Sequence, residues 1–431
     1  MSLRAAITGI SLATAIVLLP FSTLFCHLAL GVFTVCWVTE GDWREKKKRL
    51  MRNPFAWTYI VLFLIHIAGV AWSENRANAW FNIEKKILLL LLPMMMVTLP
   101  GLGKEIIRRV LLAFVAACIM GSLICLGAGL MDPVTSNFDS ATLSLYQSLN
   151  PTAAPFWLRF SYIELASGIG MHPTYLAMYL SFCIIILFHT YANELDKRSP
   201  LKKGAITGLI IYLAVFIVML SSRIVTLATM LLCIAAFFRL PHRPTYPRVV
   251  SVLVLTVMLI LVAAYPVPRY RSLQEPFIAE SYRPGTDGVY RYSTGIRKSL
   301  WIIGNLSIAQ VNPVFGAGTG DVDDTLRKIG EQHGIQNSIS SYDPHNEFIF
   351  VLVGLGLSGL ICLIACLALP AWEAYRQRNF MYLSFLFLFV AVCLTESVLE
   401  SQKGIVFFSI FNSILFFQKH VPASSGELAY G

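Results

Sequence analysis

The sequence predicts an all-α polytopic membrane protein with about twelve transmembrane helices. Apolar residues make up 56% of the 431-residue chain and charged residues only 13%, whereas a soluble domain carries roughly a quarter charged residues. The mean hydropathy is +0.66, and apolar runs close to the ~20 residues that cross a bilayer recur along the whole chain. These observations favour a single integral membrane domain over residues 1–431.

Short polar segments set the bounds of the apolar runs. The first two runs form one uncharged stretch that is divided only by the break at residues 20–23. The first run follows a single basic residue, Arg4, and lacks a small-residue cleavage pattern, so we expect an uncleaved span. The predicted spans are residues 5–20, 23–39, 55–72, 83–99, 110–130, 172–191, 204–221, 224–239, 249–265, 346–370, 380–395 and 404–418.

The distribution of Lys and Arg predicts the orientation of these spans. With the N-terminus in the cytoplasm, the inner loops and the two termini hold 20 of the 34 basic residues, including the basic run 44–49. This asymmetry follows the positive-inside rule and predicts an inner-membrane protein with both termini cytoplasmic. The net charge of +10 is explained by this topology and does not indicate a nucleic-acid partner.

All nine cysteines lie within apolar spans. They are typical of small buried hydrophobic residues, and the outer loops contain no disulfide framework. Cys362 and Cys366 have helical i,i+4 spacing but no histidine partners, which favours core packing over a metal site. We therefore expect no metal and no cofactor.

Two outer segments are too long to be simple connections. Residues 131–171 form one, and the arginine-rich residues 266–344 form a large, partly helical loop. Long ordered loops are usually functional. The glycine run 316–320 is similar to a phosphate-binding loop but lacks the Lys-Ser/Thr ending and the βαβ setting, so it is predicted to be a glycine-rich turn.

The end of the second loop places a histidine at the start of a span. Asp343 is a good N-cap and Pro344 a good first helical residue, so His345 is predicted at the second helical position. The positive field of a helix N-terminus favours a neutral, basic imidazole and attracts anions. This placement suits a general base beside a phosphate, although an interfacial histidine of structural function is the plain alternative.

Other polar residues are predicted near the same outer surface. Charges at membrane depth usually face a cavity or a partner, which makes function the default hypothesis. Each also has a structural interpretation: an arginine can reach the interface, a histidine before proline can cap a helix, and two glutamates can pair with Lys403 or an arginine. The residues concerned are His172, Arg223, Arg297, Glu396 and Glu400.

Several local patterns together resemble the bacterial O-antigen ligase and O-antigen polymerase superfamily. The resemblance covers essentially the whole chain and includes the twelve-span plan and the large outer loop before the tenth span. The patterns are Ser222-Arg223 opening a span, Arg297-x-x-x-Trp301, Asn312-Pro-x-x-Gly-x-Gly318, and Pro344-His345-Asn346-Glu347-Phe348 followed by Gly354-Leu-Gly356-Leu-Ser-Gly359.

The resemblance implies a metal-independent, inverting glycosyltransferase of GT-C-like architecture with a periplasmic active site. Its donor is a glycan on undecaprenyl pyrophosphate, and the acceptor of a ligase is a sugar hydroxyl of lipid A–core. His345 matches the family's essential histidine and Arg223 its membrane-face arginine. A loop arginine completes the set, with Arg297 preferred to Arg291 because of the tryptophan four residues on. Asp343, His172, Glu396 and Glu400 are assigned supporting functions from the residues alone.

The alternatives divide into two groups. Within the superfamily, a polymerase would use a second lipid-linked repeat unit as acceptor, and a protein O-oligosaccharyltransferase would use a protein hydroxyl. Outside it, a lipid-linked glycan transporter or flippase would place polar groups or broken helices near the bilayer midplane. The crowding of polar groups on one surface favours transfer chemistry. Besides membrane lipids and the two glycolipid substrates, the sequence indicates no obligate protein partner.

Overall fold

The computed structural model describes residues 3–99, 101–131, 159–191, 199–239, 245–264, 289–290, 293–337 and 343–417. The N-terminal helices are α1 (Leu3–Leu18), α2 (Thr23–Thr39), α3 (Trp43–Met51), α4 (Pro54–Val70), α5 (Arg76–Thr98), α6 (Lys104–Met131) and α9 (Tyr162–Ser167). The central helices are α10 (Pro173–Tyr191), α11 (Pro200–Met219), α12 (Arg223–Arg239) and α13 (Thr245–Ala264). The remaining elements are α16 (Ser293–Gln310), α17 (Val322–Gln332), α18 (Glu347–Arg376), α19 (Phe380–Cys393), η2 (Val398–Glu400), α20 (Gln402–Asn412) and the π-helical η3 (Ser413–Phe417).

The described chain is almost entirely helical, as predicted. Its strands are two short segments, β1 (Val289–Tyr290) and β2 (Gln336–Asn337), which pair in parallel. Each predicted apolar run is helical over most of its length. Four described helices, α6, α10, α11 and α18, are long and apolar enough to cross a membrane, and α2 with α3 makes a fifth if their 107° bend is counted within one span. The other apolar helices are shorter, so the count of twelve crossings stays a prediction.

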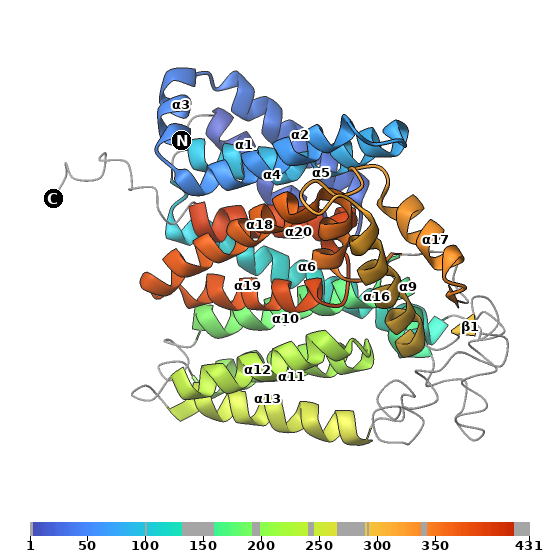
Figure 1. The fold of residues 1–431 in the computed structure, drawn as a ribbon. Coiled ribbons are helices and arrows are strands. Elements are labelled where there is room, and N and C mark those ends of the chain that lie inside the picture. The colour runs from blue at the N-terminus through green and yellow to red at the C-terminus, as the bar shows by residue number, and fades with distance from the viewer. Residues whose placement is uncertain are drawn as a thin grey trace.

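The long helices run roughly side by side (Figure 1). The basic helix α3 lies at one end of the bundle, whereas α16, α17 and β1 gather at the opposite end. This separation agrees with the predicted assignment of α3 to an inner loop and of α16 and α17 to the large outer loop. Within the two long outer segments, the structure describes residues 131, 159–171, 289–290, 293–337 and 343–344.

The C-terminal helix forms the centre of the bundle. Every residue from 404 to 417 is buried, as expected for a helix that is apolar on all sides. Phe407 stacks on Tyr179 with ring centroids 4.6 Å apart, and Phe411 lies 4.6 Å from Phe114. Aromatic side chains of α6, α10 and α20 therefore interlock in one apolar core.

A break in α18 shapes the end of the bundle that holds the outer elements. Gly356 has φ 61° and ψ −158°, so the helical hydrogen bonds across it are open. The glycine-rich loop fills the opening: Ala317 N and Gly318 N donate to the carbonyls of Val353 and Gly354 at 2.8 and 2.9 Å. On the other side, the amide nitrogens of residues 357 and 358 donate to the carbonyls of residues 313 and 314 at 2.9 and 3.1 Å. The backbone N–H and C=O groups that the break leaves without helical partners are thus hydrogen-bonded to the backbone of the glycine-rich loop. Such pairing is required for backbone groups in a low-dielectric interior.

The same loop is bound to α4 and to the start of α5. Thr319 Oγ1 donates to the carbonyl of His66 at 2.6 Å. The carboxylate of Asp321 accepts from the amide nitrogens of Glu74 and Asn75 at 2.8 and 2.7 Å. The predicted glycine-rich turn therefore fills the break in α18 with its own backbone, and we call it the plug. Its glycines permit this close contact, because a Cβ on Gly316 would lie 2.4 Å from the Gly354 carbonyl.

The plug predicts a large stability effect for Gly356→Ala. A Cβ at residue 356 would lie 2.5 Å from the carbonyl carbon of Val314, and the positive φ adds strain. We expect a greater loss of melting temperature, measured on detergent-purified protein, than for Gly334→Ala. Gly334 has φ +62° but no atom within 4 Å of a Cβ, so this control isolates the left-handed penalty of about 1–2 kcal/mol. Equal melting temperatures for the two variants would contradict the plug.

Candidate active site

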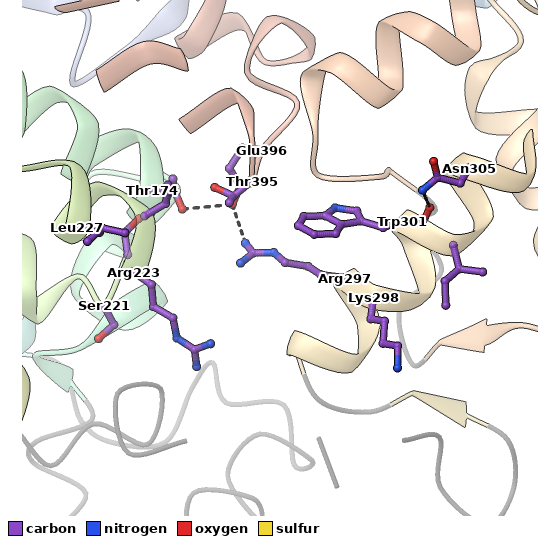
Figure 2. A pocket seen from close by; sticks show the side chains of 13 residues that line it. Thr174, Ser221, Arg223, Leu227, Arg297, Lys298, Trp301, Asn305, Thr395 and Glu396 are labelled. Atoms are coloured by element: carbon purple, nitrogen blue, oxygen red, sulfur yellow. Dashed lines mark hydrogen bonds and ion pairs between the residues drawn. The ribbon is translucent and has the colours of Figure 1, made fainter. Parts of the chain in front are cut away.

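A cavity of about 530 Å³ opens where three parts of the bundle meet. One wall is the start of α12 with the preceding serines, the opposite wall is α16, and residues Thr395 and Glu396 after α19 lie between them (Figure 2). Its charged lining consists of three cations and one carboxylate. These are Arg223, Arg297, Lys298 and Glu396.

Arg223 is brought to the cavity by a tight hairpin. Helix α11 ends at Met219 and α12 begins at Arg223, with Ser221 in the left-handed region at φ 53°. The predicted spans 204–221 and 224–239 are therefore joined by a tight turn. Because Arg223 is the first residue of its helix, its side chain extends from the wall beside Ser221 (Figure 2).

Helix α16 presents a polar face to the cavity and an apolar face to the protein. Ile296, Leu300 and Ile303 are buried, and Gly304 packs closely against Ile349 of α18. The opposite face carries Arg297, Trp301 and Asn305, which are spaced by one helical turn and line the cavity. Lys298 extends from this wall in the same direction as Arg223 from the other (Figure 2).

Glu396 connects the two predicted functional groups. Its Oε2 lies 3.0 Å from Nδ1 of His345, and its Oε1 lies 2.9 Å from Nη2 of Arg297. Thr174 of α10 also donates to Oε1, at 3.3 Å. The Glu396 side chain is only 6% exposed, so this carboxylate is held by partners from three elements. A hydrogen bond through Nδ1 leaves Nε2 of the imidazole as the nitrogen that can accept a proton.

The pKa of His345 differs from the sequence prediction. We call His345 and Glu396, which are hydrogen-bonded to each other, the dyad. Burial lowers the pKa of His345, but the hydrogen bond and charge of Glu396, together with the charge of Asp343, raise it above the usual value. Burial raises the pKa of Glu396, and the contacts with His345 and Arg297 more than reverse this. The expectation that the surroundings favour neutral His345 is therefore wrong, because Glu396 stabilises the imidazolium.

The local structure around His345 also differs from the prediction. Helix α18 begins at Glu347, and Asn346 is its N-cap, with Oδ1 accepting from the amide nitrogens of residues 348 and 349 at 3.0 and 3.1 Å. His345 precedes the helix and has φ 46°. Asp343 does not cap the helix, because its Oδ1 accepts from His345 N at 2.9 Å and from Ser397 Oγ at 2.6 Å.

Two segments, residues 343–347 and residues 394–400, are joined by a row of hydrogen bonds. We call these two segments the stitched segments. Besides Asp343 with Ser397 and His345 with Glu396, Asn346 Nδ2 donates to the Leu394 carbonyl at 3.1 Å. Glu347 Oε2 accepts from Leu399 N at 2.7 Å. Each side chain in this row fixes the distance between the histidine and the carboxylate.

Glu400 anchors the stitched segments to α5. Its carboxylate pairs with Lys85, 3.1 Å away, and with Lys86. Burial raises the pKa of Glu400, but the charges of Lys86 and Lys85 outweigh it and lower the pKa. The two lysines were not singled out from the sequence, although charges in an otherwise apolar span are a signal for a buried partner. Lys403, one of the two alternative partners named for the glutamates, instead donates to the Pro20 carbonyl at 3.3 Å.

The remaining predicted site residues are less directly involved. His172 lies immediately before α10, where Nδ1 accepts from Thr174 N at 3.4 Å and the ring packs near Tyr162 and Tyr175. Arg291 lies outside the described residues. Among the residues that the structure describes, no group of three or more His, Cys, Asp or Glu side chains could hold a metal ion.

A comparison with known protein families gives a match over part of the chain. Residues 208–364 match the family model described as O-antigen ligase. This match supports a similarity to the O-antigen ligase and polymerase superfamily over that part of the chain. No curated protein matches the chain. The segment that matches the O-antigen ligase family contains Arg223, Arg297 and His345, whereas Glu396 lies outside it. Because the superfamily comprises glycosyltransferase-like ligases and polymerases, the match supports glycan transfer by a multi-pass membrane protein.

The dyad predicts opposite changes in the protonation of His345. Glu396 raises the pKa of His345 and Arg297 lowers it, so Glu396→Gln should shift the midpoint of its titration to lower pH and Arg297→Gln should shift it to higher pH. The measurement is the pH dependence of diethyl pyrocarbonate modification, which needs neutral imidazole, followed by mass spectrometry of the His345 peptide. The peptide of His333, the C-cap residue of α17, is the internal reference. Shifts in the same direction for both variants would contradict the dyad.

Proposed function

We propose that the protein is an O-antigen ligase. It transfers a glycan from undecaprenyl pyrophosphate to a sugar hydroxyl of lipid A–core at the periplasmic face of the inner membrane. The observation that carries the proposal is the position of Glu396, which joins His345 to a cavity lined by Arg223, Arg297 and Lys298. A base next to a cationic cavity is what transfer from a diphosphate leaving group requires.

The cations of the cavity compensate the leaving group. The donor diphosphate carries two or more negative charges, and guanidinium groups bind such oxygens bidentately without losing their protons. Arg223 and Lys298 approach from opposite walls, and Arg297 is oriented by Glu396 (Figure 2). When the bond between the sugar C1 and the phosphate oxygen breaks, the electron pair goes to the diphosphate, and these cations stabilise it.

His345 acts on the acceptor. The acceptor hydroxyl oxygen attacks C1 from the side opposite to the diphosphate, which inverts the anomeric centre. Its proton passes to Nε2 of neutral His345. Glu396 accepts from Nδ1 at 3.0 Å, so the imidazolium forms next to a buried carboxylate. The raised pKa of His345 makes it a stronger base, and transfer should increase with pH as His345 loses its proton.

The localisation proposal follows from the two ends of the bundle. The basic helix α3 is opposite to α16, which lines the cavity (Figure 1). With α3 and both termini on the cytoplasmic side, the cavity faces the periplasm. Lipid-linked donor and lipid-anchored acceptor then meet in the same leaflet, where confinement raises their effective concentration.

Deletion of the gene tests the proposal in cells. We expect loss of polymer from lipid A–core, with long polymer still attached to undecaprenyl pyrophosphate, when both pools are resolved on one gel. Accumulation of single repeat units, with one repeat still reaching the core, would indicate a polymerase. An unchanged pattern in both pools would overturn glycan transfer.

His345→Asn tests the general base. His345 has φ 46°, and asparagine tolerates the left-handed region, so this variant removes the imidazole without adding backbone strain. Transfer measured in membranes should fall by about 10²–10⁴-fold at equal protein abundance. His333→Asn at the C-cap of α17 is the matched control. Transfer by His345→Asn at the rate of the control would exclude His345 as the base.

Arg223→Lys tests bidentate recognition of the diphosphate. Lysine keeps the charge but loses the planar pair of donors. We expect transfer to fall by about 10²-fold or more, whereas Arg239→Lys at the far end of α12 should leave it unchanged. A fully active Arg223→Lys enzyme would mean that a point charge is sufficient.

A further inference from the structure

The polar face of α16 carries more than phosphate ligands. Arg297, Trp301 and Asn305 follow one another at four-residue spacing and all line the cavity. A helix rises 1.5 Å per residue, so the three side chains start about 6 Å apart along one line. This step is close to the length of one pyranose unit.

Trp301 is partly exposed. Its exposed fraction is 39%, although it lines the cavity. The indole lies beside the Arg297 side chain (Figure 2), and among the described residues it makes no ring contact of the kind that joins Phe407 to Tyr179. An aromatic face left open inside a cavity is available to a flat ligand group.

Asn305 adds a hydrogen-bonding group one turn further on. Its Nδ2 donates to the Trp301 carbonyl at 2.8 Å, which fixes the orientation of the amide. The Oδ1 is then the atom that can accept from a ligand hydroxyl. Lys298 and Ile302 of the same helix also line the cavity.

We propose that Trp301 and Asn305 form a sugar subsite for the residue attached directly to the donor diphosphate. This inference rests on the proposed function, since Arg297 must bind the diphosphate for Trp301 to lie next to the first sugar. The C–H groups of a pyranose face carry partial positive charge and stack on the negative face of indole. Asn305 accepts from a hydroxyl of the same sugar. Trp301 is thus a specificity-determining residue, and it selects a first sugar with a flat, apolar face.

The test compares two lipids on the purified full-length protein. One is undecaprenyl pyrophosphate, and the other is the lipid-linked glycan extracted from the deletion strain. We expect Trp301→Leu to weaken binding of the glycan-bearing lipid by about 3- to 10-fold relative to wild type and to leave binding of undecaprenyl pyrophosphate unchanged. Trp301→Phe, which keeps an aromatic face, should restore most of the difference.

A second exposed tryptophan provides the matched control. Trp72 is 40% exposed but packs on Phe315 outside the cavity, with ring centroids 5.6 Å apart. Trp72→Leu should change the affinity for neither lipid. If Trp301→Leu weakened both lipids equally, or neither, the sugar subsite would be overturned. Failure of the wild-type protein to bind undecaprenyl pyrophosphate would overturn the donor assignment instead.

Discussion

The buried carboxylate of Glu396 is the contact on which the arrangement of the site depends. It holds His345 before α18, Arg297 on α16 and Thr174 on α10. A buried charge is tolerated only when its partners compensate for its lost hydration, so each partner restrains the others. Since the three partners come from distant parts of the chain, the relation between base and cation is a property of the tertiary packing. No local motif could hold the two at this spacing.

The stitched segments extend this restraint across the end of the bundle. Glu396 and Glu400 are four residues apart, yet one faces the cavity while the other pairs with Lys85 and Lys86 of α5. The short segment between α19 and α20 is therefore bound on both sides. Rigid support of this kind is what holds reacting groups within a fraction of an ångström. Each of the two carboxylates is paired with cations, which limits the cost of burying it.

Much of the fold could be predicted because apolar runs of nearly constant length are a strong signal. The individual bounds moved by a few residues, and the short turn before Arg223 follows from the predicted spans 204–221 and 224–239. The N-cap of α18 could not be predicted, since Asp343 and Asn346 are equally good N-caps by residue type and only the structure shows that Asp343 is bonded to Ser397. Lys85 and Lys86 were missed for a similar reason: their partner, Glu400, is more than 300 residues away in the chain. Glu396 was assigned a supporting function, but its pairing with both His345 and Arg297 needed coordinates.

The break in α18 has a consequence for how the protein is made. Taken alone, residues 347–376 would enter the bilayer with the backbone groups at Gly356 unsatisfied, and each such group costs several kcal/mol in hydrocarbon. The groups that satisfy the break, at residues 313–318, precede it in the chain, as do α4 and α5, which hold that loop. All of these partners have been synthesised when α18 leaves the ribosome. Membrane insertion of α18 is thus coupled to assembly of the N-terminal helices. A chain truncated at its N-terminus would lack α4 and α5, which hold the loop that hydrogen-bonds to the break in α18.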